Sequence, residues 1–425
     1  MALFGNRKRR TEVLERPEYG WIWKPLLALL VVYLLVCLVL GIWWSQRPEP
    51  FDIGQATTRQ LGAPADADLP RGARLTASML TVVETLLDKP GGWLRNDMLL
   101  PGVWLDNMPS WEYGVLTQVR TLGKALPAMS PAGTDALESA STLLQSDSED
   151  WLYPAAEKRY SQAQGALASY LAGIARDDQG FAADGEGLAR WLDAVSRRFS
   201  GLTQQLLASV DDPEALRELG VDDAALPDAT PWFRIDNVFF EARGDAWGLL
   251  QLLKAARLDY ADVLGKANGG ATLERLIAEL ELAQRRIWSP VILNGSGFGI
   301  FANHSLVLAN HTQAIAELTG QLAGSVQGVE VTAPQSASQP AASKGGSDNS
   351  GAPGASEASS NAAAGGAASN APQAGDTDES EAGSGDNADE GAEAGTASTG
   401  DAEAGGNPGQ GGQGDAGDGA AAQQQ

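Results

Sequence analysis

Residues 89–113 contain three tryptophans, Trp93, Trp104 and Trp111, and the carboxylate of Asp106 lies between two of them in the sequence. Indole rings beside a carboxylate can stack on a sugar or hold a peptide, so we predict that these four residues bind a ligand. The same composition also suits a long loop between helices. In that case the rings anchor the loop on the core and the carboxylate caps a helix.

A second candidate, Asp236, lies in an aromatic segment that also carries Arg234, Glu241 and Arg243. Its carboxylate suits the N-cap of a helix, where it can accept hydrogen bonds from free backbone N–H groups. The neighbouring charges could bind an anionic ligand or form ion pairs inside the fold. We therefore predict Asp236 as a ligand-binding residue, with a capped core helix as the alternative.

A glycine-rich segment, residues 289–299, precedes a predicted helix that begins near residue 303. Such a turn presents backbone N–H groups at the positive end of the helix dipole, which favours an anion. A tight turn between two long helices explains the glycines equally well, and no Gly-Lys-Ser/Thr follows them as in a nucleotide-binding loop. The residues that we predict to bind a ligand here are Asn294, Gly295, Gly297 and His304.

No combination of nucleophile, base and acid identifies a reaction. His304 could act as a general base beside Ser296 or Ser305, but one histidine near a serine is weak evidence. His304 and His311 are seven residues apart, about 10.5 Å along a helix, which is too far to share one metal ion. We predict no catalytic residue, no metal site and no cofactor, and favour a non-enzymatic function.

The chain that must position these residues starts with an apolar run from Leu26 to Trp44, nineteen residues without a charge. As a helix it would span about 28 Å, close to the hydrocarbon thickness of a bilayer. Five basic residues precede it within the first sixteen positions. Because basic residues stay in the cytoplasm, we predict a transmembrane helix with the N-terminus inside and the body outside. The bulky Trp43 and Trp44 at its end argue against cleavage as a signal peptide.

Beyond the anchor, apolar residues recur every three or four positions, and alternating patterns typical of strands are nearly absent. This periodicity predicts helices near 75–87, 109–126, 152–176, 187–210, 237–264, 271–288 and 303–325. We predict an all-α, bundle-like domain. The expected regions are a cytoplasmic basic stub (1–20), a transmembrane helix (21–44), a linker (45–74), a helical periplasmic domain (75–328) and a disordered acidic tail (329–425).

The tail prediction depends on composition. From residue 331 the chain has fourteen acidic residues, one lysine and no aromatic residue, Leu, Ile or Met. Such a segment cannot bury enough apolar surface to offset the entropy of ordering. No basic stripe follows the anchor, so nucleic acid is not an expected partner.

Five segments carry a resemblance to a known family: residues 21–25, 87–92, 101–109, 289–296 and 303–305. Over roughly residues 15–325 the chain resembles an uncharacterised family of proteobacterial inner-membrane proteins, a domain-of-unknown-function family. The resemblance implies a Gram-negative source, an inner-membrane location and a periplasmic body. It implies no reaction, ligand or catalytic residue.

We therefore predict a single-pass inner-membrane protein whose periplasmic helical domain is an envelope scaffold or accessory binding subunit. Its expected partners are the lipid bilayer and an envelope protein. The alternative is an envelope enzyme or ligand-binding protein that acts on cell-wall glycan or peptide. Convergence of the candidate segments on one cleft would favour the alternative, and their burial in the core would argue against it.

Overall fold

The computed structural model describes residues 20–64, 68–131, 134–177, 180–210, 216, 228–286, 292 and 303–331. Within this part of the chain the regular elements are helices, and the β-type pairing is one isolated bridge between Asp184 and Glu330. The all-α prediction is confirmed. Of the predicted basic stub (1–20) and the predicted tail (329–425), residues 1–19 and 332–425 lie outside the described residues. Residues 329–331 instead pair with the body, because the Gly185 N–H donates to the Val329 carbonyl oxygen and the Val331 N–H to that of Ala183, at 2.8 Å each.

The α-helices are α1 (Gly20–Trp44), α2 (Ile53–Leu61), α3 (Ala73–Asp88), α4 (Asn107–Met129), α5 (Thr134–Leu144), α6 (Ala156–Asp177), α7 (Glu186–Leu207), α9 (Ile235–Asp259), α10 (Ala261–Lys266), α11 (Gly270–Ala283) and α12 (His304–Val326). Two short 3₁₀ turns, η1 (Gly102–Trp104) and η3 (Trp232–Arg234), precede α4 and α9.

Within the described chain, α1 is the one helix long and apolar enough to cross a membrane. Most of its large apolar side chains are exposed, whereas the equivalent side chains of the other long helices face the core. Pro25 lies in its second turn, and tryptophans end the helix at Trp43 and Trp44. Such a helix is expected wherever an apolar run of this length occurs, because it satisfies all its backbone hydrogen bonds internally.

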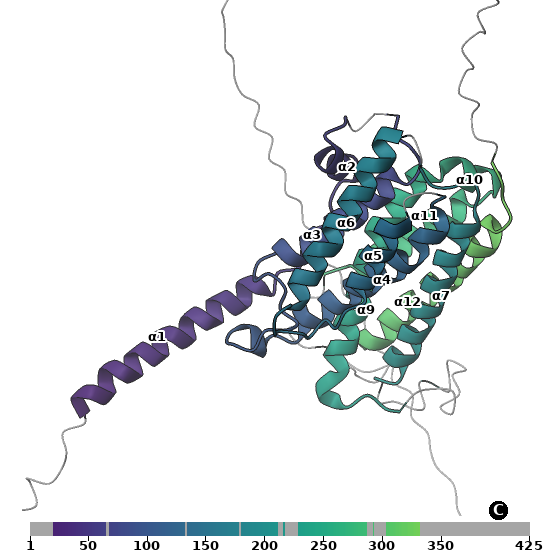
Figure 1. The fold of residues 1–425 in the computed structure, drawn as a ribbon. Coiled ribbons are helices and arrows are strands. Elements are labelled where there is room, and N and C mark those ends of the chain that lie inside the picture. The colour runs from purple at the N-terminus through teal and green to yellow at the C-terminus, as the bar shows by residue number, and fades with distance from the viewer. Residues whose placement is uncertain are drawn as a thin grey trace, which may run out of the picture. The chain divides into compact units, whose positions relative to one another are not determined.

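The body is a bundle in which α4 packs along α9, and α7 packs along α12 (Figure 1). Glycines allow the close approach of α4 and α9. A Cβ atom on Gly114 would lie 2.0 Å from the carbonyl oxygen of Glu241, and one on Gly244 would lie 2.0 Å from that of Trp111. Side chains of any size at these two positions would therefore meet the backbone of the other helix.

The seven body helices expected from periodicity are present, with ends shifted by a few residues, but the segment predicted as 237–264 is two helices. The break is at Tyr260, whose ring is buried. Two helices were not predicted. One is α5, and the other is α2, which lies inside the predicted linker; Asp52 caps α2 by accepting a hydrogen bond from the Gln55 N–H at 2.8 Å.

Asp259, at the end of α9, supplies the cap that α3 lacks in its own sequence. Its fully buried carboxylate accepts a hydrogen bond from the backbone N–H of Leu75 at 2.7 Å, and the guanidinium of Arg74 lies 3.8 Å away. Burial raises the pKa of Asp259 to about 6, although these donors oppose the shift. The carboxyl of Asp259 therefore binds a proton more tightly in the folded protein than in the unfolded chain.

Stability is thus expected to fall as the pH rises from about 4 to about 6, because the raised pKa of Asp259 favours the folded state only below this window. Asp259→Asn keeps an oxygen acceptor for Leu75 but does not titrate. We expect it to reduce the pH dependence of the free energy of unfolding across this window by roughly 1–3 kcal/mol. Urea denaturation of the full-length protein in detergent, at pH 4.5 and pH 7, measures this difference.

Asp262→Asn is the matched control. Partial burial raises the pKa of Asp262, but the hydrogen bond from Arg71 contributes to a larger opposite effect. The pKa of Asp262 therefore lies below its ordinary value of 3.8. Its titration therefore lies below the tested window, and the variant should keep the wild-type slope. An unchanged slope in Asp259→Asn would show that this carboxyl does not titrate as described.

Candidate functional site

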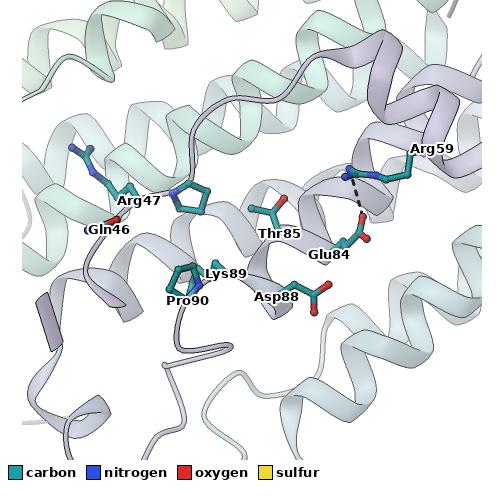
Figure 2. Close-up of a pocket in the computed structure, with 9 residues that line it drawn as sticks. Gln46, Arg47, Arg59, Glu84, Thr85, Asp88, Lys89 and Pro90 are labelled. Carbon is teal, nitrogen blue, oxygen red and sulfur yellow. Dashed lines mark ion pairs between the residues drawn. The ribbon is translucent and has the colours of Figure 1, made fainter. Parts of the chain in front are cut away.

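A polar groove lies where the chain leaves α1 and enters the body (Figure 2). Its volume is about 490 Å³. The residues that line it come from the stretch after α1, from α2 and from the end of α3: Gln46, Arg47, Pro48, Arg59, Glu84, Thr85, Asp88, Lys89 and Pro90. Arg59 and Glu84 form an ion pair at 3.7 Å across the groove. Both signs of charge are therefore present on a surface that opens to solvent.

Lys89 differs from the other lining residues because its ammonium group points into the core. Its Nζ lies 2.5 Å from Oε1 of Glu112 in α4, and both side chains are buried. Glu112 also accepts a hydrogen bond from the backbone N–H of Leu94 at 3.0 Å, and Lys89 donates to the carbonyl oxygen of Gly92. Burial raises the pKa of Glu112 to about 7, against the stabilising effect of Lys89. This pair fixes the loop between α3 and η1 on α4.

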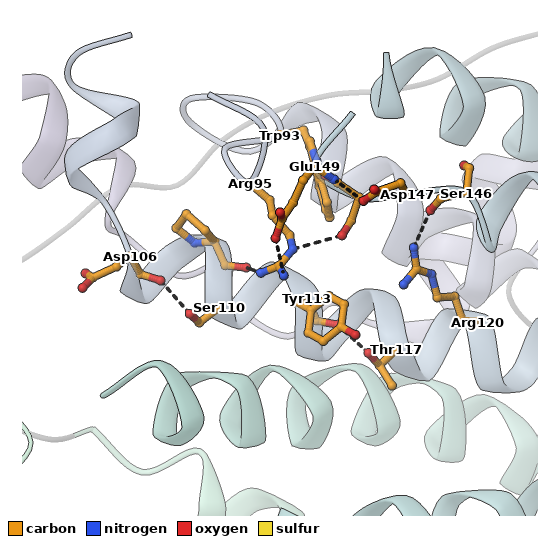
Figure 3. Close-up of polar contacts among 12 residues, drawn as sticks. Trp93, Arg95, Asp106, Ser110, Tyr113, Thr117, Arg120, Ser146, Asp147 and Glu149 are labelled. Carbon is orange, nitrogen blue, oxygen red and sulfur yellow. Dashed lines mark hydrogen bonds and ion pairs between the residues drawn. The ribbon is translucent and has the colours of Figure 1, made fainter. Parts of the chain in front are cut away.

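The rest of that loop is held by its polar and aromatic side chains. Trp93 donates from Nε1 to the carbonyl oxygen of Ser148 at 3.0 Å, and its ring meets Tyr160 edge-on at 5.3 Å. Arg95 pairs with Glu149 at 2.9 Å and stacks over Tyr113 at 4.2 Å (Figure 3). The segment therefore joins α3, α4 and the start of α6 into one unit.

Of the three predicted tryptophans, two lie in the core. Trp93 is almost fully buried, and Trp111 is fully buried against Trp247 at 5.2 Å between ring centroids. Trp104, in η1, is exposed. A ring without accessible surface can reach a ligand only if the core opens, so Trp104 is the one of the three that is placed to touch another molecule.

The two predicted carboxylates, Asp106 and Asp236, come together from different elements. Asp106 caps α4, because its carboxylate accepts a hydrogen bond from the Asn107 N–H at 2.9 Å. Its carbonyl oxygen accepts a second one from the Ser110 hydroxyl at 2.8 Å (Figure 3). Asp236 lies inside the first turn of α9 instead of at its N-cap, because the helix begins earlier, directly after η3. Partial burial, and then the charge of Asp106, raises the pKa of Asp236.

His304 opens α12, next to a group of cations. Its ring lies 6.4 Å from that of Phe239, and burial together with Arg243 lowers the pKa of His304. Arg243 is buried and donates to the carbonyl oxygens of Gln284 and Arg285, at 2.8 Å each. Burial, and then the charge of Arg47, lowers the pKa of Arg243 to about 9. Arg243 in the third turn of α9 therefore adds its positive charge to that of Arg47, which follows α1, and such an environment favours an anion.

The remaining predicted residues, Asn294, Gly295 and Gly297, lie outside the described residues. Ser305, a conceivable partner for His304 as base, is fully buried. In the described parts of the chain no group of three or more His, Cys, Asp or Glu side chains is arranged to hold a metal ion. What these parts offer chemically is polar and apolar binding surface.

The groove of Figure 2 was not predicted from the sequence. Arg59, Glu84 and Asp88 are ordinary charged residues on amphipathic helices, and nothing in their spacing indicates that α2 and α3 place them opposite one another. Arg47 is the one lining residue whose position in the sequence stands out, because it is the first charged residue after the apolar run.

Comparison with known proteins gives one match. The model of a family described as an uncharacterized protein conserved in bacteria (DUF2333) matches residues 16–320. No curated protein and no solved structure matches the chain. The matched region starts just before α1 and extends into α12, so it covers both the apolar helix and the body.

Proposed function

The chain belongs to this uncharacterised bacterial family, and from that premise we propose that it is a membrane-anchored accessory subunit of the bacterial envelope. In this proposal α1 spans the inner membrane, the basic N-terminus is cytoplasmic and the body is periplasmic. The body acts as a scaffold that binds a protein partner at the membrane surface. The predicted localisation, the lipid bilayer as a partner and the envelope protein partner are all parts of this proposal.

The polar groove after α1 is the observation that carries the proposal. Its lining holds two cations, Arg47 after α1 and Arg59 of α2, and two anions, Glu84 and Asp88 of α3. A polar peptide segment of either sign of charge therefore meets a residue of opposite charge. The groove begins two residues after the last residue of α1. A partner seated there is therefore held close to the membrane, as an accessory subunit requires.

In-cell photo-crosslinking tests this function. A benzoylphenylalanine replaces Asp88, which is an exposed lining residue of the groove, in the full-length protein. The matched control carries the same group at Arg275, exposed on α11. We expect a discrete adduct from position 88, identified by mass spectrometry as an envelope protein, and none from position 275. Identical adducts from both positions, or none from position 88, would count against a partner in the groove.

One observation favours the alternative, an envelope enzyme or ligand-binding protein that acts on cell-wall glycan or peptide. Asp106 and Asp236 come from separate elements and are close enough for one charge to affect the other. Paired carboxylates can share general acid and base roles. If position 88 gives no protein adduct, these two carboxylates become the first residues to substitute.

A further inference from the structure

The loop before α4 touches α1 inside the apolar part of that helix. The residues that line an apolar groove of about 530 Å³ between them are Cys37, Leu38, Gly41, Ile42 and Ser45 of α1 and Pro101, Trp104 and Leu105 of the loop. A Cβ atom on Gly41 would lie 3.8 Å from Leu105 Cδ2, and Cys37 is only 3% exposed although its neighbours on α1 are open. The loop therefore runs beside α1, not only beyond its end.

The depth of this contact follows from helix geometry. Cys37 precedes Trp44, the last residue of α1, by seven residues, which is about 10.5 Å along the axis. Tryptophans at the end of a spanning helix lie at the level of the headgroups. Trp44 also packs on the body, because a Cβ atom on Gly91 would lie 2.8 Å from its ring. A loop that reaches Cys37 from there lies below the headgroups, at the level of the acyl chains.

The composition of the loop matches that environment. Residues 98–105 contain no charged side chain, and their sequence is Met-Leu-Leu-Pro-Gly-Val-Trp-Leu. Met98, Leu99, Val103 and Trp104 are exposed, with Leu99 at 80%. Four large apolar side chains in water on one short loop are unfavourable, at about 25 cal/mol per Å² of apolar surface, and a bilayer would remove that cost.

The last three residues of the loop pair their backbone N–H groups within the loop. The N–H groups of Val103, Trp104 and Leu105 donate to the carbonyl oxygens of Leu99, Pro101 and Gly102 at 3.0, 3.0 and 2.9 Å. Pro101 has no N–H group to satisfy. Each of these hydrogen bonds removes one backbone N–H group from contact with the acyl chains, where an unpaired polar group is costly.

A neighbouring loop carries further exposed apolar side chains. Trp151, Leu152 and Tyr153 are exposed just before α6, with Tyr153 at 90%. Asn96 ties the two loops together, because its Nδ2 donates to the carbonyl oxygen of Asp150 at 2.8 Å. Trp and Tyr are the residues that prefer the boundary between acyl chains and headgroups.

We propose that residues 98–105, the insertion loop, enter the leaflet on the body's side of the membrane that α1 spans, with Trp151–Tyr153 at its surface. The inference rests on the proposed function, since it requires α1 to span a bilayer. The occupant of the apolar surface is lipid because the loop is continuous with the lipid-facing surface of α1. The body is then held against the membrane at two places, by α1 and by the insertion loop.

Fluorescence quenching in lipid nanodiscs tests this inference on the full-length protein. Single cysteines carrying the fluorophore NBD are placed, in a Cys37→Ala background, at Val103 in the insertion loop, at Ile42 in α1 and at Ser169 on α6. All three side chains are exposed in the structure. Lipids with a doxyl group near the top of the acyl chain quench probes in the bilayer, and iodide quenches probes in water.

We expect at least twofold stronger quenching by the doxyl lipid at position 103 than at position 169, and the reverse order with iodide. Position 42 tests whether α1 spans the bilayer separately from whether the insertion loop enters it. A probe there should be quenched by lipid whether or not the loop inserts. Iodide quenching at 103 with lipid quenching at 42 would overturn the inference and leave the anchor intact. Protection of 103 from both quenchers would also overturn it, since a protein would then cover the loop. No lipid quenching at 42 would overturn the anchor itself.

Discussion

Gly244→Leu is expected to prevent stable folding of the body. A Cβ atom at this position lies 2.0 Å from the carbonyl oxygen of Trp111, and the atoms nearest to it belong to the backbone of α4. A flexible side chain could move aside, but a helix backbone can do so only by separating α4 from α9. Because these two helices form the centre of the bundle, we expect a loss of at least about 3 kcal/mol in the free energy of unfolding.

Gly165→Ala is the control for glycine replacement as such. Gly165 is an exposed residue of α6, and a Cβ atom there meets no atom within 4 Å. Alanine should leave stability unchanged or raise it by about 0.5–1 kcal/mol, because glycine is a poor helix former. Urea denaturation followed by circular dichroism measures both variants. A Gly244→Leu protein as stable as the Gly165→Ala protein would contradict the close packing of α4 on α9.

Lys89→Met is expected to have the second-largest effect. The substitution keeps the apolar stem of the side chain but leaves Glu112 as a fully buried carboxylate without its cation. Removing one partner from such a pair costs about 3–5 kcal/mol. Because burial already raises the pKa of Glu112 to about 7, the carboxyl can take up a proton. The loss should therefore be larger at pH 8 than at pH 5.

The double variant Lys89→Met/Glu112→Gln separates the charge from the packing. Glutamine keeps an oxygen that can accept from the Leu94 N–H but carries no charge, so most of the lost stability should return. Lys254→Met removes a partly exposed cation from Glu281, which is itself exposed, and should cost no more than about 1 kcal/mol. Equal losses in the single and double variants would mean that the buried charge is not what destabilises Lys89→Met.

The helices were largely predictable because periodicity records which face of a helix is buried. In α4 the apolar residues that recur at helical spacing are all buried: Val115, Leu116, Val119, Leu122 and Leu126. The short helices were missed because α2 and α5 offer too few turns for a pattern. The signals that identify α2 are its caps, Asp52 before it and Gly62 after it with a φ of 66°.

The environment of single residues was less predictable, because it depends on pairs far apart in the sequence. Trp93 and Trp104 are alike in type and close in sequence, yet one is buried under Ser148 and Tyr160 and the other is exposed beside α1. The same holds for Glu112, whose partner Lys89 lies 23 positions earlier. Composition indicates that such residues have a structural or binding role. Whether a given ring lies in the core or on the surface depends on tertiary packing.

The proposed function and the inserted loop describe one arrangement. α1 and the insertion loop hold the body at the membrane surface, and the polar groove after α1 is presented there to a partner. This arrangement requires α1 to be an uncleaved anchor that keeps the body on the outer side of the inner membrane.

Labelling of single cysteines in spheroplasts tests this requirement most directly. A membrane-impermeant maleimide is applied to full-length protein that carries a cysteine at Ser169 in the Cys37→Ala background, and the membranes are then washed with alkaline carbonate. If α1 is such an anchor, we expect labelling in intact spheroplasts, retention in the washed membranes and an intact mass that includes the residues before α1. Labelling only after lysis would contradict the orientation, and release of a shortened chain into the supernatant would contradict the anchor.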